Sequence, residues 1–174
     1  MLGLVAGILT VAQIILSFFF FNSTGLVTLQ VVGGILWALS IVFGCLPIYF
    51  LQKEGGIPEG KSHINTTKLV DSGLYGIVRH PQYLAGIFFN LALIFIAQNW
   101  IIVIIGIISA ILFYIDTHNA DKDCIEKFGD DYECYMESVP RINLLMGIIR
   151  LQRRRKKEKH LTEDLKTNSR TQIR

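Results

Sequence analysis

Two long runs of apolar residues dominate the pattern of the chain. Residues 1–51 and 83–115 contain no Asp, Glu, Lys or Arg, so all 17 basic and 14 acidic residues lie in 52–82 and 116–174. A helix rises about 1.5 Å per residue, so the runs would reach roughly 76 Å and roughly 50 Å, against a hydrocarbon core of about 30 Å. Each run must therefore turn back once.

Short polar sequences mark where the two runs turn. Asn22-Ser23-Thr24-Gly25 consists of turn formers, and Gln98-Asn99 is followed by Trp100, a residue type common at membrane interfaces. Because the second run is short for two complete spans, a tight hairpin that crosses only part of the bilayer stays open. We predict four transmembrane helices, at about 2–21, 26–51, 82–97 and 100–116.

The position of the charges predicts how these helices are oriented. Both outer loops are uncharged, whereas the 52–82 loop and the segment after residue 115 hold every Lys and Arg. The positive-inside rule then places both termini and the large loop in the cytosol. We therefore expect an all-α, multi-pass integral membrane protein, with two helices in 1–51 and a helical hairpin in 82–116.

Two polar segments are expected to form the cytosolic part of the protein. Residues 52–81 are rich in glycine and turn formers and predict a loop. Residues 117–141 predict a helical extension, in which the fourth helix continues to Phe128 and ends at Gly129. An acidic residue and several tyrosines in this extension could be brought back beside the start of the third helix.

The C-terminal part of the chain consists of two segments that differ in composition. Residues 142–157 join an apolar stretch to Arg153-Arg154-Arg155-Lys156-Lys157, which predicts an amphipathic interfacial segment that attracts anionic lipid. Nucleic acid is the weaker alternative, because the cluster adjoins a membrane domain. Residues 158–174 lack core-forming content and are expected to be disordered.

Candidate chemistry gathers where the third helix begins, at Arg79-His80-Pro81-Gln82-Tyr83. Pro81 suits the first position of a helix and biases His80 away from helical angles, which places His80 at the cap. Chemistry on a lipid-borne substrate with a water-borne cofactor requires such an interfacial position. The alternative is that Arg79 and Tyr83 only anchor the helix at the interface.

The three cysteines do not point to a metal site or a disulfide. Cys45, Cys124 and Cys134 have neither metal-ligand nor disulfide spacing, and the last two lie on the predicted reducing side of the membrane. We expect no bound metal.

Three features together resemble the isoprenylcysteine carboxyl methyltransferase family, which groups with phospholipid methyltransferases as small membrane enzymes that use S-adenosylmethionine. The features are LVDSGLYGIVRHPQY, the hairpin after it, and DKDCIEKFGDDYECYMESVPR. The resemblance covers about residues 52–141, and two signals in the right order are more specific than either alone. It implies methyl transfer to a membrane lipid or a prenylated small molecule.

The resemblance also implies a cofactor cleft beside the third helix. Leu69 and Val70 match family residues that line the cofactor, and Tyr75 matches the tyrosine of the GxY element. The HPxY element that closes over the cofactor corresponds to His80, Pro81, Gln82 and Tyr83.

The chain departs from the family pattern at two positions. The family usually has two adjacent glutamates before the phenylalanine of its FG pair, and here they correspond to Ala120 and Asp121. Asp121 is thus the single carboxylate expected to bind cofactor. The prenylcysteine enzymes have an arginine where this chain has Asp116, and an acid there favours a cationic or neutral headgroup over a carboxylate.

Roles follow for the remaining candidates. Arg79 and Asp116 are expected to contact substrate, and His80 to bind cofactor and to serve as general base if the acceptor is an amine. Two other functions stay open. One is a nicotinamide-dependent enzyme similar to the sterol reductases, and the other is a non-catalytic membrane anchor with a basic recruiting tail, which Ala120 favours.

Overall fold

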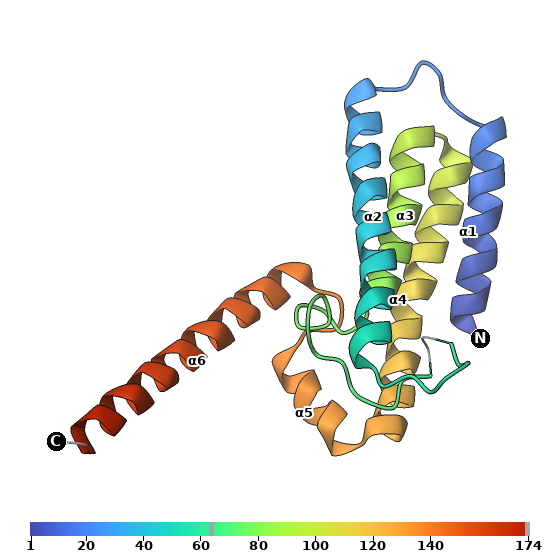
Figure 1. Cartoon of the computed structure of the whole chain (residues 1–174). Helices are drawn as coiled ribbons and strands as arrows, with labels where there is room; N and C mark the ends of the chain where they lie inside the picture. The colour runs from blue at the N-terminus through green and yellow to red at the C-terminus, as the bar shows by residue number, and fades with distance from the viewer. Residues whose placement is uncertain (63–64, 173–174) are drawn as a thin grey trace.

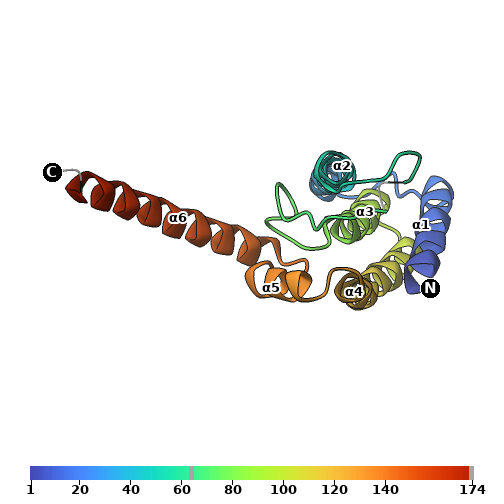
Figure 2. The ribbon, with the colours of Figure 1, turned by 60° about the horizontal axis from the view of Figure 1, so that its bottom comes forward.

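The computed structural model describes residues 1–62 and 65–172, which form helices and no strand. The helices α1 to α4 stand side by side as a bundle (Figure 1), and they pack in the order α2, α3, α4, α1 (Figure 2). The expected all-α fold is confirmed. The helices are α1 (Leu2–Phe19), α2 (Val27–Glu54), α3 (Pro81–Ala97), α4 (Trp100–Phe128), α5 (Asp130–Ser138) and α6 (Leu144–Gln172).

The outer surface of the bundle is apolar. On α1, the exposed side chains Leu4, Ile8, Val11 and Ile15 recur at helical spacing and form one face. Contiguous apolar surface of this extent marks contact with lipid rather than water. By length and composition α1, α2 and α4 can each cross a membrane, and α3 is a shorter apolar helix of 17 residues. The chain is a multi-pass membrane protein.

The helix ends agree closely with the polarity pattern. α3 begins at Pro81 with His80 as its N-cap, as predicted. α4 continues to Phe128, and Gly129 follows with a φ of +57°, a conformation that glycine adopts without strain. The second helix runs past the predicted residue 51 to Glu54, because Gln52-Lys53-Glu54 are good helix formers and the next glycine after them is Gly55.

The side chain of Gln98 connects the α3–α4 turn to the start of α2. Its Nε2 donates to the carbonyl oxygen of Leu26 at 2.9 Å, and its Oε1 accepts from the Leu26 N–H at 2.8 Å. Gln98 itself has a φ of +48°, which turns the chain directly from α3 into α4. The polar pair predicted to break the second run therefore also fixes the start of α2.

The C-terminal part leaves the bundle at its other end. α5 lies beside the end of α4, and α6 extends away from the bundle at an angle (Figure 1). α6 runs to Gln172 through a segment for which disorder was expected, and the chain has no Gly or Pro after Gly147 and is rich in helix-forming Lys, Arg and Glu. Residues 173–174 lie outside the described residues.

Candidate active site

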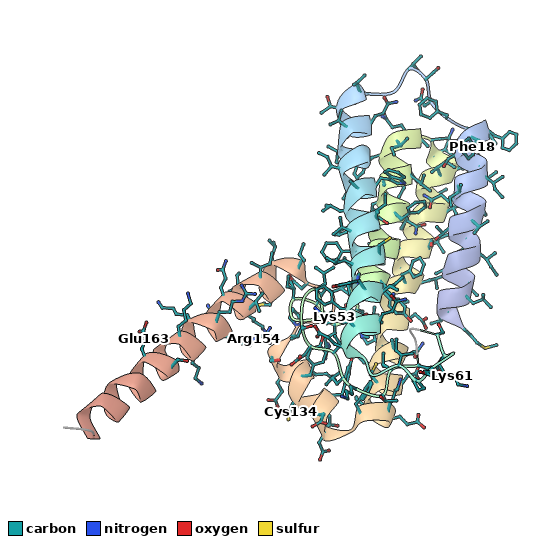
Figure 3. The ribbon with its side chains drawn as sticks, viewed as in Figure 1. Phe18, Lys53, Lys61, Cys134, Arg154 and Glu163 are labelled. Carbon is teal, nitrogen blue, oxygen red and sulfur yellow. The ribbon has the colours of Figure 1, made fainter. Side chains whose placement is uncertain are left out.

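A cavity of about 330 Å³ lies at the charged end of the bundle, where the 66–80 loop, the start of α3, the last turns of α4 and α5 meet. Its volume falls in the range of small-molecule sites. Figure 3 shows the side chains that crowd this end of the bundle. The lining residues are Leu51, Thr66, Lys68, Leu69, Val70, Tyr75, Arg79, His80, Pro81, Gln82, Tyr83, Ala120, Cys124, Lys127, Phe128, Tyr132 and Tyr135.

Backbone hydrogen bonds hold the segment that enters α3. The N–H of Arg79 donates to the carbonyl oxygen of Pro140 at 3.0 Å, and the N–H of His80 donates to that of Arg141 at 3.1 Å. Val78, just before them, is completely buried. Two segments some 60 residues apart in sequence thus fix each other beside the cavity.

The carboxylate of Asp121 gathers four donors from different parts of the chain. Its Oδ1 accepts from His80 Nε2 and from the Tyr132 hydroxyl, each at 2.7 Å. Its Oδ2 accepts from Arg141 Nε at 2.8 Å and from Arg79 Nη2 at 3.3 Å. The Asp121 side chain is only 5% exposed, so these charge-assisted bonds compensate the cost of its burial.

The bond to Asp121 decides which nitrogen of His80 is free. A carboxylate oxygen can only accept a hydrogen bond, so the Nε2 of His80 carries the proton. In neutral imidazole Nδ1 is then the nitrogen that can take up a further proton. The His80 ring also packs edge-on against that of Tyr83, with centroids 5.7 Å apart.

Arg79 is a buried cation with unused donors. The residue is 9% exposed, and its Nε and Nη1 have no hydrogen-bond partner among the residues that the structure describes. Leaving buried donors of a charged group unpaired is costly. Because Arg79 also lines the cavity, these atoms fit an anionic group of a ligand.

Three tyrosines give the cavity an aromatic, uncharged wall. The Tyr135 hydroxyl donates to the carbonyl oxygen of Tyr75 at 2.6 Å, and the Tyr132 and Tyr135 rings lie 5.6 Å apart. Burial raises the pKa of all three tyrosines, and the hydrogen bond to Asp121 raises that of Tyr132 further. All three therefore stay protonated at neutral pH.

The structure brings most of the predicted site residues to the cavity and leaves out two. Among the described residues, Asp121 and Asp116 do not line it. Asp121 instead binds the groups that form the wall, and Asp116 accepts from the Tyr83 hydroxyl at 3.4 Å and from Asn119 Nδ2 at 2.9 Å. The predicted site residues that line the cavity are Leu69, Val70, Tyr75, Arg79, His80, Pro81, Gln82 and Tyr83.

Other wall residues were not predicted from the sequence. Ala120, Cys124 and Phe128 recur every four residues and lie on one face of α4, so helical spacing from Ala120 could have identified the latter two. Arg141 lies 20 residues from Asp121, beyond α5, and no local pattern indicated their contact.

Comparison with known proteins gives one match. The family described as phospholipid methyltransferase matches residues 27–127, which is more than half of the chain and runs from the start of α2 almost to the end of α4. Neither a curated protein nor a solved structure matches significantly. The matched span contains the cavity residues from Leu51 to Lys127.

Proposed function

The chain belongs to the phospholipid methyltransferase family, and from this premise we propose that it transfers a methyl group from S-adenosylmethionine to a lipid acceptor at the cytosolic face of the membrane. The family is one of membrane methyltransferases that act on lipids. The observation that carries the more specific proposal is the buried Arg79, which has two unpaired donors and lines a cavity of about 330 Å³.

The residues of the cavity fit this cofactor. When bound, S-adenosylmethionine supplies an electrophilic methyl group on a cationic sulfonium. Arg79 would bind an anionic group through Nε or Nη1, for which the cofactor's carboxylate and a lipid phosphate are the two candidates. Tyr75 and Tyr83 offer ring faces to a cation, a contact of about 0.5–2 kcal/mol.

Asp121 has a positioning role in this proposal. Its Oδ1 fixes the His80 ring, and its Oδ2 accepts from Arg79 Nη2, while Nε and Nη1 of Arg79 stay without a partner among the described residues. The direct contact with cofactor that the family resemblance implied for the second carboxylate is not supported by this arrangement, because Asp121 already accepts four hydrogen bonds.

Two further side chains support an amine as the acceptor. A carboxylate or thiolate acceptor needs no base at neutral pH, whereas a protonated amine must first lose a proton. His80 Nδ1 can take that proton, since Asp121 holds Nε2. Asp116 beside Tyr83 adds negative charge near the wall, which favours an amine headgroup over a carboxylate.

The charge distribution supports the cytosolic placement. The cavity lies at the end of the bundle where the 55–80 loop holds Lys61, Lys68 and Arg79, whereas the opposite loop is uncharged. The positive-inside rule assigns this end to the cytosol, where the cofactor is available.

Binding of radiolabelled S-adenosylmethionine to the purified protein tests the proposal. We expect competition by S-adenosylhomocysteine and none by a nicotinamide cofactor; the reverse pattern would instead support a reductase. Arg79→Gln should weaken binding, whereas Lys61→Gln, an exposed substitution outside the cavity, should not. If Arg79→Gln, His80→Ala and Asp121→Ala all left the affinity unchanged, the cavity would not be the cofactor site, and the membrane-anchor alternative would be favoured. Mass spectrometry after incubation with lipid extracts and prenylcysteine analogues then identifies the acceptor.

A further inference from the structure

The first turns of α6 are docked on the loop that carries the candidate site. Gly147 packs so closely on the carbonyl of Ile77 that any side chain at position 147 would collide with it. Arg154 Nη2 donates to the carbonyl oxygen of Gly76 at 2.5 Å, and Arg150 Nη1 donates to that of Glu137 at 3.0 Å. α6 is thus attached both to the 76–77 segment and to the end of α5.

The docked residues of α6 share one face. Leu144, Gly147, Leu151 and Arg154 are buried or half-buried and follow each other at intervals of three or four residues. The other large apolar side chains of the first turns of α6 point outward. These are Leu145 at 76% exposure, Ile149 at 48%, Met146 at 44% and Ile148 at 38%.

A row of cations follows this apolar surface directly. Residues 153–157 are all Arg or Lys, and within this run Arg153, Arg155, Lys156 and Lys157 are exposed while Arg154 turns toward Gly76. An apolar surface followed by cations is the composition of helices that lie at a membrane surface. Each cation near an anionic leaflet strengthens attachment.

The position of α6 agrees with this composition. The helix starts at the height of the lower part of α2 and slopes away from the bundle (Figure 1), with its first turns next to α5 (Figure 2). Its apolar turns therefore come first, nearer the bundle, and its cations come farther out. This order matches the layers that a helix meets at a bilayer surface, from acyl chains to charged headgroups.

We propose that the outer face of α6, formed by Leu145, Met146, Ile148, Ile149 and the exposed cations of 153–157, binds an anionic lipid surface. Through its docked face, this attachment holds the 76–80 segment in place. The same linker that leads into α6 supplies the carbonyl oxygens of Pro140 and Arg141 to the N–H groups of Arg79 and His80. Anionic lipid therefore stabilises the backbone beside the cavity.

The first test measures attachment of the full-length protein in lipid nanodiscs. We expect trypsin to cleave after residues 153–157 much more slowly in discs containing phosphatidylglycerol than in pure phosphatidylcholine discs, and the protection to fall about fivefold for each cation removed. The test variant is Arg153→Gln/Lys156→Gln/Lys157→Gln, and its cleavage is measured after Arg154 and Arg155, the two cations that remain in 153–157. Its matched control, Lys53→Gln/Lys61→Gln/Lys122→Gln, removes the same charge elsewhere and should leave the protection intact.

The second test measures the effect on the site. Amide hydrogen exchange of residues 76–80 should be slower in the anionic discs than in the neutral discs, and the triple variant of 153, 156 and 157 should abolish that difference. Ile148→Ser/Ile149→Ser, which keeps every charge, should weaken both effects. Equal cleavage in the two kinds of disc would overturn the proposal, as would stronger protection by a single-stranded oligonucleotide than by anionic lipid. Both readouts are independent of methyl transfer.

Discussion

The Nε2 of His80 donates to the Oδ1 of Asp121 at 2.7 Å, across 41 residues of sequence. This bond joins the N-cap of α3 to the C-terminal turns of α4. Because the same carboxylate also binds Arg79 and Arg141, it determines at once the tautomer of a histidine and the positions of two cations. The geometry of the cavity wall therefore depends on one carboxylate outside its lining.

Removal of this carboxylate should destabilise the protein. In Asp121→Ala, the buried Arg79 and the half-buried Arg141 lose their counterion, and we expect the free energy of unfolding to fall by about 3–5 kcal/mol. Denaturant titration in detergent micelles measures the change. Asp123→Ala, two residues away and exposed, is the control and should change stability little. Equal losses in both variants would contradict the role assigned to Asp121.

Replacement of His80 should separate acceptor classes. His80→Gln retains a donor for Asp121 but has no basic nitrogen, so we expect methyl transfer to an amine acceptor to fall by about 100-fold or more, with cofactor affinity nearly unchanged. His118→Gln is the matched control, because His118 is exposed and contacts Arg141 at 2.6 Å. Transfer to a thiol or carboxylate acceptor should be far less affected by His80→Gln. Unchanged transfer to an amine would exclude His80 as the base.

The sequence predicted those parts of the fold that depend on local pattern. Absence of charge located the helices, Pro81 located the start of α3, and Gly129 located the end of α4. The four-donor arrangement at Asp121 could not be predicted, because Tyr132 and Arg141 reach it only after α5 folds back. The family pattern identified positions 120 and 121 but not which of the two faces the cavity, since that depends on how α4 is rotated.

The contact between α2 and α3 predicts a sharp difference between two adjacent glycines. A Cβ at position 33 would lie 2.7 Å from Ile96 Cγ1 and 2.9 Å from the Ala92 carbonyl oxygen, whereas a Cβ at Gly34 would meet nothing within 4 Å. We expect Gly33→Ala to lower stability by about 1–3 kcal/mol and Gly34→Ala to leave it nearly unchanged. Unfolding in mixed micelles measures both. Equal effects would mean that α2 packs on α3 through another face.

The buried tyrosines predict loss of stability at alkaline pH. Burial raises the pKa of Tyr75, Tyr132 and Tyr135 in the folded state above the value of about 10 in the unfolded state. Their stabilisation is therefore complete below pH of about 10 and is lost as the pH rises, by up to about 1.4 kcal/mol per pH unit for each tyrosine.

Unfolding measured between neutral and alkaline pH tests this dependence. In Tyr135→Phe the decline above pH of about 10 should be shallower, although the protein is less stable at neutral pH because the hydrogen bond to Tyr75 is missing. Tyr49→Phe, at an exposed position on α2, should retain the full decline. A decline that Tyr135→Phe leaves unchanged would assign the alkaline sensitivity to other groups.

Position 120 tests whether the cavity is a cofactor site of the family type. Ala120 lines the cavity where the family resemblance implies a glutamate, whereas Asp121 is occupied by its four donors. Ala120→Glu would add a carboxylate able to accept hydrogen bonds from the cofactor, each worth about 1.5–3 kcal/mol. We expect S-adenosylmethionine to bind about 10-fold to 100-fold more tightly, as measured by equilibrium dialysis. Ala120→Gln has the same size without the charge, so it should gain less. If both substitutions weakened binding equally, the added volume would be blocking the cavity, and the family position would not correspond to residue 120.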